Sequence, residues 1–259
     1  MVIDGALAQR ISLEESAAEF CYRYKQTQQR RSASCHEDIP RPTLPSIALS
    51  STKTRYINKQ HEGDGAMDID AVMEVIQTHA AKTGKKAMYA FNISAEIDEM
   101  QKRYEKIVTA GGTAAMISIN SVGLSATKKI CDIGALAIHA HRNGWGMLTR
   151  HPLLGMDFRA YQKIWRLVGV DQLHVNGIQN KFWESDDSVV SSIGAMMQPL
   201  GKQLYPLPVV SSGQWGGQAF ETWRRTETTD LLYMAGGGIL AHPMGPQAGV
   251  KALQQAWDA

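Results

Sequence analysis

A predicted strand followed by a predicted helix repeats six times between residue 68 and the C-terminus, and this alternation limits the possible folds more than any other feature. Each predicted strand is short and apolar, as expected where both faces of a sheet are covered. Alternating β and α segments indicate a parallel sheet with helices packed against it. The predicted strands cover residues 87–92, 114–119, 135–141, 171–175, 207–211 and 230–235.

The helices are predicted from apolar side chains at intervals of three and four residues. Asp68 is expected to cap the helix before the first strand, Ser94 to cap the next helix, and Asp186 and Asp187 to cap a later one. Gly169 is expected to end the helix that starts at Phe158. The predicted helices lie near residues 69–76, 97–108, 128–134, 158–168, 187–197, 218–225 and 246–257.

Two architectures fit this alternation, an open doubly wound sheet and a closed barrel. Polar residues follow the predicted strands, and in a barrel the ends of all strands meet at one mouth, where active sites lie. In an open sheet the same residues would spread along an edge. We therefore predict an α/β fold of the (β/α)8, TIM-barrel type over residues 67–259. The barrel is expected to be incomplete, because six units are legible where eight are needed.

Residues 1–66 do not follow this pattern, and we predict that they form an atypical, poorly defined N-terminal segment. Residues 32–46 carry several prolines and are predicted to be a loop. Residues 46–50 and 54–57 are at best short strands. The segment either lacks order or supplies irregular elements to the barrel.

Composition excludes several classes of protein. The chain has 27 Lys and Arg against 25 Asp and Glu, which gives no reason to expect nucleic acid or an anionic membrane as a partner. Its three cysteines have no CxxC spacing and indicate free thiols in a reducing compartment. No apolar run reaches the roughly 18 residues of a membrane span. We therefore expect a soluble cytoplasmic protein.

Histidines end two neighbouring strands of the predicted barrel. His141, followed by Arg142, ends one strand, and His174 ends the next. A histidine at a strand end is often only a structural hydrogen-bonding group, but two at one barrel mouth favour proton transfer near neutral pH. The planar guanidinium of Arg142 matches a phosphate or carboxylate.

Lys181 and two groups of small residues complete the candidate site. A loop lysine is usually just solvated, but Lys181 lies in a loop that could place an ammonium over a developing anion. Ser211 and Gly213 follow a strand and could bind an oxyanion, or only cap a helix. Gly237 and Gly238 belong to a run of three glycines after the last strand, where exposed N–H groups could hold a phosphate or merely form a tight turn.

These residues, in this order, resemble the barrel of RuBisCO and the RuBisCO-like proteins. The resemblance runs from about residue 68 to the C-terminus and is specific, because several spaced motifs each follow the expected strand. Among the RuBisCO-like proteins, the 3-oxo-isoapionate-4-phosphate decarboxylase type is the most similar. The motifs are YAFN at 89–92, HAHRNGWG at 139–146, residues 155–185, LPVVSSG at 207–213 and AGGGILAHPMGP at 235–246.

The resemblance implies roles for the candidate residues. Lys181, His141 and His174 match catalytic positions of the family. Phosphate or substrate binding is implied for Arg142, Ser211, Gly213, Gly237 and Gly238.

The resemblance also implies a chemistry, in which Mg²⁺ polarises a phosphorylated keto-sugar acid and stabilises the enediolate that decarboxylation leaves. The protein would then be a carbon–carbon lyase of carbohydrate catabolism. The 2,3-diketo-5-methylthiopentyl-1-phosphate enolase type, a tautomerase, is the alternative.

The metal-binding half of the family pattern is hard to find in this sequence. The family binds Mg²⁺ through a Lys-Asp-Asp-Glu run with a carbamylated lysine, and the nearest string here holds Lys59, His61 and Glu62. That string is a candidate metal site or a solvated polar loop. The family's N-terminal domain, which covers a partner's active site in a dimer, is not visible either. A non-catalytic, phosphate-binding paralogue therefore stays open, as a homodimer or paired with a full-length homologue.

Overall fold

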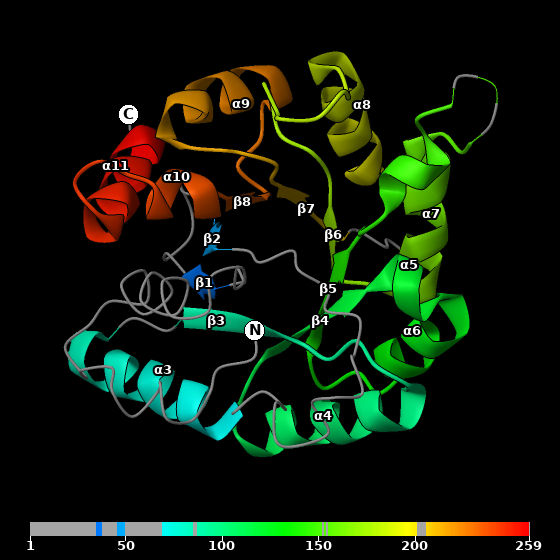
Figure 1. The fold of residues 1–259 in the computed structure, drawn as a ribbon, viewed down its shortest axis with the longest axis vertical. Helices are drawn as coiled ribbons and strands as arrows, with labels where there is room; N and C mark the ends of the chain where they lie inside the picture. The colour runs from blue at the N-terminus through cyan, green and yellow to red at the C-terminus, as the bar shows by residue number, and fades with distance from the viewer. Residues whose placement is uncertain are drawn as a thin grey trace.

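The computed structural model describes residues 35–37, 46–49, 69–84, 87–151, 153, 155–200 and 206–258, and in them the strands form a closed barrel (Figure 1). Six strands pair in parallel, each with the next strand along the chain. All six fall within the predicted strands. They are β3 (Ala87–Asn92), β4 (Ala114–Ser118), β5 (Ala137–His141), β6 (Gln172–His174), β7 (Leu207–Val210) and β8 (Leu232–Met234).

Two short strands from the N-terminal segment close the sheet between β3 and β8. β2 (Ser46–Leu49) pairs in parallel with β8, and β1 (Cys35–Glu37) is antiparallel to both β2 and β3. The predicted α/β barrel is therefore confirmed, and it is incomplete as a (β/α)8 fold because β1 and β2 stand where two βα units are missing. The prediction of a loop over residues 32–46 is wrong at β1. Residues 54–57 lie outside the described residues.

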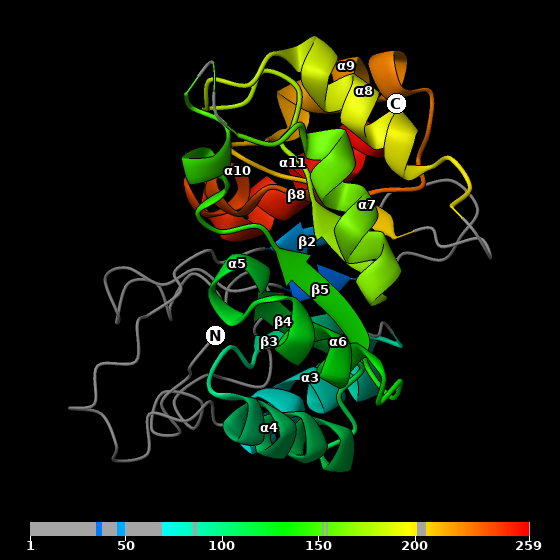
Figure 2. The same cartoon turned by 90° about the vertical axis from the view of Figure 1, so that its right-hand side faces the viewer.

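Helices surround the barrel on its outer side (Figures 1 and 2). The glycine run was predicted as a turn, but Gly236–Gly238 instead forms the first turn of the short helix α10. None of the helices in the described residues is long and apolar enough to cross a bilayer. They are α3 (Ile69–Thr83), α4 (Ile97–Thr109), α5 (Ile119–Val122), α6 (Leu124–Cys131), α7 (Phe158–Val168), α8 (Asp186–Met196), α9 (Ala219–Thr226), α10 (Gly236–Leu240) and α11 (Pro246–Asp258).

Two predicted helix caps are wrong. The residue before α4 is Glu96, whose side chain caps nothing, and Ser94 instead accepts a hydrogen bond from the backbone N–H of Ser118. α8 is capped by Ser185, which accepts from the N–H of Ser188. Asp68 lies outside the described residues. The prediction that Gly169 ends α7 is confirmed, since Gly169 adopts the left-handed conformation at φ 104°.

Side chains alternate between the two faces of each strand, as the period of two requires. Tyr89, Ile138, Leu173 and Tyr233 belong to the large core between the sheet and the helices. The alternate residues form separate, smaller clusters that we assign to the barrel interior. The apolar members of these clusters are Met88, Ala90, Ala114, Met116 and Ala137, and on the other side Leu207, Val209, Leu232 and Met234.

Candidate functional site

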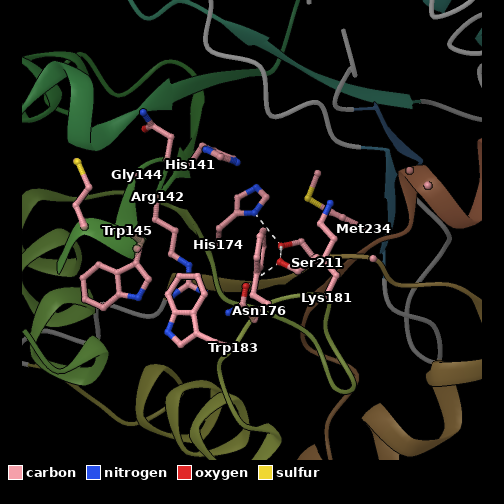
Figure 3. A pocket seen from close by; sticks show the side chains of 18 of the residues that line it. His141, Arg142, Gly144, Trp145, His174, Asn176, Lys181, Trp183, Ser211 and Met234 are labelled. Atoms are coloured by element: carbon pink, nitrogen blue, oxygen red, sulfur yellow. Dashed lines mark hydrogen bonds between the residues drawn. The ribbon is translucent and has the colours of Figure 1, made fainter. Parts of the chain in front are cut away.

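A cavity of about 700 Å³ lies where β5, β6, β7 and β8 end. Figure 3 shows Arg142 and Trp145 on one side of it, Lys181 with Met234 on the other, and His141 and His174 between them. Among the described residues, the structure therefore brings all the sequence-predicted site residues except Gly238 together around one space. Those that line the cavity are His141, Arg142, His174, Lys181, Ser211, Gly213 and Gly237.

Two neighbouring glycines of α10 have different surroundings. A Cβ atom added to Gly238 would lie 2.6 Å from the carbonyl oxygen of Gln214 and 2.6 Å from Cβ of Trp215. A Cβ added to Gly237 would meet no protein atom within 4 Å, and Gly237 lines the cavity. Glycine at 238 is thus explained by close packing of two backbone segments, whereas Gly237 leaves space in the pocket.

Arg142 is buried in an ion pair with Glu184. Its Nη2 donates to Oε2 of Glu184 at 3.2 Å, and the two side chains are 7% and 12% exposed. The guanidinium carbon also lies 4.3 Å from the ring centre of Phe158. Burial lowers the pKa of Arg142, and Glu184 opposes this shift. Nη1 of Arg142 is buried without a hydrogen-bond partner among the described residues, so one side of its fork remains available to an anion.

Glu184 also holds the amide of Asn176, whose Nδ2 donates to its Oε2. Oδ1 of Asn176 accepts from the hydroxyl of Ser212 at 2.7 Å. Ser212 takes φ 75°, which is uncommon for a residue other than glycine and places its hydroxyl toward Asn176. Arg142, Glu184, Asn176 and Ser212 therefore form one network that links β5, β6 and β7 at the cavity.

Three histidines lie close together, of which His141 and His174 line the cavity and His139 lies behind them. His139 and His174 approach each other with 2.8 Å between their Nε2 atoms, and the rings of His141 and His174 are centred 4.5 Å apart. Burial lowers the pKa of His139 to about 4. Burial, with the nearby His139 and Arg142, also lowers the pKa of His141 well below its usual range. His139 and His141 are therefore neutral imidazoles near pH 7.

The loop that carries Lys181 is fixed to the barrel by side-chain amides. Gln218 Nε2 donates to the carbonyls of Ile178 and Gln179, at 3.2 Å and 3.0 Å. Asn180 bonds within the loop to the carbonyl oxygens of Gly177 and Glu184. The backbone N–H of Lys181 donates to the carbonyl of Ser212 at 3.1 Å. These contacts hold the loop in place and set the Lys181 ammonium over the cavity.

An aromatic side chain borders the cavity next to the loop. Trp183 lines the cavity and stacks with Arg150, whose guanidinium carbon is 4.5 Å from the ring centre. A Cβ at Gly146 would lie 2.9 Å from the Trp183 ring, so glycine at 146 allows the ring to sit there. Trp183 and Arg150 together present an apolar surface beside a positive charge to any ligand that enters.

The described residues do not form a magnesium site. They contain no group of three or more His, Cys, Asp or Glu side chains placed to hold a metal ion. The carboxylate nearest Arg142, Glu184, is occupied by Arg142 and Asn176. Because Mg²⁺ prefers carboxylate oxygens, this part of the cavity does not fit it. The predicted ligands Lys59, His61 and Glu62 lie outside the described residues.

Sequence reasoning missed His139, Asn176 and Glu184. His139 could have been found, because residues two apart on a strand share a face, and His141 was already assigned to the barrel mouth. Asn176 follows β6 by two residues, so its place near the strand end was also predictable. Glu184 had no such signal, since only the path of the loop brings it back to Arg142.

Comparisons with known proteins identify related sequences. The model of the ribulose bisphosphate carboxylase large chain, catalytic domain, matches residues 64–259. The 3-oxo-isoapionate-4-phosphate decarboxylase of Rhizobium rhizogenes is 53% identical over 194 residues, which are 74% of this chain and 46% of that protein. The 3-oxo-isoapionate-4-phosphate transcarboxylase/hydrolase of Xanthobacter autotrophicus is 46% identical over 193 residues, 74% of this chain and 47% of that protein.

A solved structure gives the same result. The crystal structure of a rubisco-like protein from Burkholderia fungorum matches with a TM-score of 0.71 and 45% sequence identity, over 74% of this chain and 48% of that one. The chain therefore spans about half the length of the relatives that it matches. The matched half includes every described residue that lines the cavity.

Proposed function

Because the chain belongs to the ribulose bisphosphate carboxylase large-chain family, we propose that it decarboxylates a phosphorylated 3-keto sugar acid in carbohydrate catabolism. The observation that carries the proposal is the identity of 53% to a 3-oxo-isoapionate-4-phosphate decarboxylase. That identity falls on the half of the relative that corresponds to this cavity. A β-keto acid of this class loses CO₂ and leaves an enolate oxygen that needs positive charge or hydrogen-bond donors.

Lys181 is the residue that we assign to this oxygen. It lines the cavity, and no ion pair with a carboxylate holds its ammonium among the described residues. The anchored loop fixes its position before the substrate arrives, so little reorganisation is needed when charge develops. Lys181 would thus stabilise the enediolate, while a neutral histidine that lines the cavity would exchange a proton with it.

The phosphate of the substrate is assigned to the other polar groups of the cavity. Arg142 offers the free side of its guanidinium, and Gly237 offers a first-turn N–H that has no carbonyl partner within its helix. Ser211 and Gly213 line the space beside them. Glu184 neutralises part of the Arg142 charge, which favours one phosphate group over two.

Mg²⁺ is part of the proposal only because the chain belongs to this family. Its chemistry would be to polarise the keto group of the substrate. The candidate ligands are Lys59, His61 and Glu62, and calorimetric titration with Mg²⁺, with and without bicarbonate, tests them directly. Bicarbonate-dependent binding that disappears in Lys59→Ala supports this site, whereas unchanged binding in the variant contradicts it. Cytoplasmic location and a homodimer, or pairing with a full-length homologue, are likewise proposed.

A second candidate is enolase-type tautomerisation, which the two histidines that line the cavity favour. An imidazole beside the substrate could remove a proton next to a carbonyl, a step that decarboxylation does not require. The two reactions differ in whether CO₂ leaves the substrate. Measuring the products therefore separates them.

The test is incubation of the full chain with 3-oxo-isoapionate 4-phosphate and Mg²⁺, with CO₂ release and the remaining substrate measured together. We expect CO₂ release that falls at least 100-fold in Lys181→Met, because an oxyanion-stabilising donor is typically worth 10²- to 10³-fold in rate. Lys163→Met, an exposed lysine of α7, is the matched control and should keep full activity. Substrate consumption without CO₂ supports the tautomerase instead, and binding without turnover supports a non-catalytic paralogue.

A further inference from the structure

Four side chains from three neighbouring strands form a hydrogen-bonded chain that leads from the barrel interior to the cavity. Gln172 Oε1 contacts His139 Nδ1 at 2.7 Å, and His139 Nε2 contacts His174 Nε2 at 2.8 Å. His174 Nδ1 then contacts Ser211 Oγ at 3.2 Å (Figure 3). Ser211 Oγ lies 3.0 Å from the carbonyl oxygen of Val175. His139 is fully buried, whereas Ser211 lines the cavity.

We infer that His139 is a positioning residue that fixes which nitrogen of His174 carries the proton, so that Nδ1 of His174 is a base directed at Ser211. The inference rests on the proposed function only for the source of the proton that this base would accept. His139 itself does not line the cavity. It acts through His174, which does line the cavity.

The proton positions follow from Gln172. Its amide Nε2 is directed at Met88 Sδ, 3.9 Å away, which leaves the carbonyl Oε1 facing His139. A carbonyl oxygen accepts only, so His139 must donate from Nδ1. A neutral His139 then has a bare Nε2, and the contact with His174 needs a proton on His174 Nε2. His174 in turn is left with a bare Nδ1, which faces the hydroxyl of Ser211.

The chain of contacts is complete only when one proton is added. The two neutral imidazoles and the hydroxyl bring three protons to four contacts, so Ser211 can donate either to His174 or to Val175. If a substrate proton moves to Ser211 Oγ, the hydroxyl proton moves to His174 Nδ1. His174 becomes an imidazolium that donates to both His139 and Ser211, and Ser211 donates to Val175. All four contacts then hold one proton each.

The groups around the hydrogen-bonded chain from Gln172 to Ser211 favour its uncharged state before a proton arrives. The side chains of the hydrogen-bonded chain and its contacts on β3, on β6 and after β7 are Met88, Gln172 and Ser211, which carry no charge. From β5, the neutral His141 lies 4.5 Å from the His174 ring and is followed by Arg142, whose positive charge helps to lower the pKa of His141. Lys181, which also lines the cavity, is the other nearby cation.

The test is nitrogen NMR of the unliganded full chain with ¹⁵N-labelled histidine at pH 8. Long-range proton–nitrogen spectra distinguish a bare ring nitrogen from a protonated one, and His174→Gln identifies the signals of His174. We expect Nδ1 of His174 to be bare and Nε2 to be protonated. His139→Leu removes the acceptor that faces Nε2, so the proton should move to Nδ1 and donate to Ser211.

Two further variants complete the test. His139→Gln keeps an acceptor near the former Nε2 position and should retain the wild-type proton position. His151→Gln, an exposed histidine outside the chain of contacts, should change nothing at His174. If His139→Leu does not fold, Gln172→Leu replaces it, because loss of the amide oxygen should move the proton of His139 to Nε2 and that of His174 to Nδ1.

A wild-type His174 protonated at Nδ1 overturns the inference. So does a proton that stays on Nε2 in His139→Leu or in Gln172→Leu, since His139 would then have only a structural role. These measurements use no substrate. Absence of CO₂ release in the wild-type protein would contradict the proposed function and leave the proton positions as they are.

Discussion

The two sides of the barrel interior have opposite chemistry. From β5 to β7 the barrel interior includes histidines, a glutamine and, directly after β7, a serine, whose polar atoms bond to one another beside the apolar Ala137, Leu207 and Val209. On β3 and β4 the inward positions hold Met88, Ala90, Ala114 and Met116, which pack as a small apolar cluster. The helices outside both sides are joined by one continuous core. The difference therefore lies inside the barrel and not in how the sheet is supported.

This difference shows how a barrel with two missing βα units can keep a site. The cavity depends on the ends of β5 to β8 and on the loops that follow them, and these four strands pair in parallel with one another. β1 and β2 close the sheet between β3 and β8, where β2 pairs with β8. If this division is right, changes on the polar side should affect ligand, charge and pH, whereas changes on the apolar side should affect packing alone.

The largest effect is expected from Glu184→Ala, which breaks the buried pair with Arg142. The guanidinium is 7% exposed, so it would be left as a buried charge with no counter-charge. Breaking a buried pair by removing one partner costs about 3–5 kcal/mol of the free energy of unfolding. Denaturation in urea measures the change.

Glu99→Gln serves as the control for that variant. Its pair with Arg103 on α4 is 43% and 24% exposed, so its loss should produce no resolvable change, because solvent screens such pairs. Equal losses of stability in Glu184→Ala and Glu99→Gln would contradict the view that the polar side depends on its buried ion pair.

Acid should destabilise the protein through the buried histidines. The pKa of His139 is lowered in the folded state from 6.5 to about 4, so the unfolded chain binds more protons between these values. The stability that neutral His139 contributes is complete above pH 6.5 and is lost as pH falls toward 4. It is on the order of 3 kcal/mol, since one pKa unit corresponds to about 1.4 kcal/mol.

The measurement is the free energy of unfolding in urea between pH 7.5 and 5. His139→Gln should show a smaller slope than the wild-type protein over this range, because one titrating histidine is gone. Parallel curves for the two proteins would show that His139 does not carry this pH dependence.

The polar side was more predictable from sequence than the closure of the barrel. Strand ends at His141, His174 and Ser211 could be placed because apolar runs and helix periodicity bracket them, and a parallel barrel brings strand ends together. β1 could not be predicted, because the three residues Cys35–Glu37 have no strand pattern and become a strand only by pairing with β2 and β3. Long-range pairing of this kind leaves no local signal.

The glycine run shows the same limit at the scale of one residue. The sequence placed Gly237 and Gly238 after the last strand and assigned both to a phosphate. The structure assigns only Gly237 to the cavity, because the orientation of α10 turns Gly238 toward Gln214. Adjacent residues of a helix point in directions about 100° apart, and only the packing of that helix decides which one meets a ligand.

A moderate effect on stability is expected from Gly238→Ala. The added methyl would lie 2.6 Å from the Gln214 carbonyl oxygen, and a backbone atom cannot move aside as a flexible side chain can. Overpacking of this kind costs about 1–3 kcal/mol. Thermal or urea denaturation should show the loss in the absence of any ligand. Unchanged stability would mean that α10 and the Gln214 segment are not in close contact.

The smallest effect on stability is expected from Gly237→Ala, which tests the polar side most directly. Its methyl meets no protein atom within 4 Å, and alanine favours a helix over glycine by roughly 0.5–1 kcal/mol, so stability should stay equal or rise slightly. The methyl should occupy ligand space, and calorimetry with 3-oxo-isoapionate 4-phosphate should show at least a tenfold weaker affinity. Gly194→Ala, on α8 and also without contacts, is the matched control and should leave binding unchanged. Equal affinities for Gly237→Ala and Gly194→Ala would remove Gly237 from the binding site and would confine the ligand to the side of the cavity formed by Arg142 and Lys181.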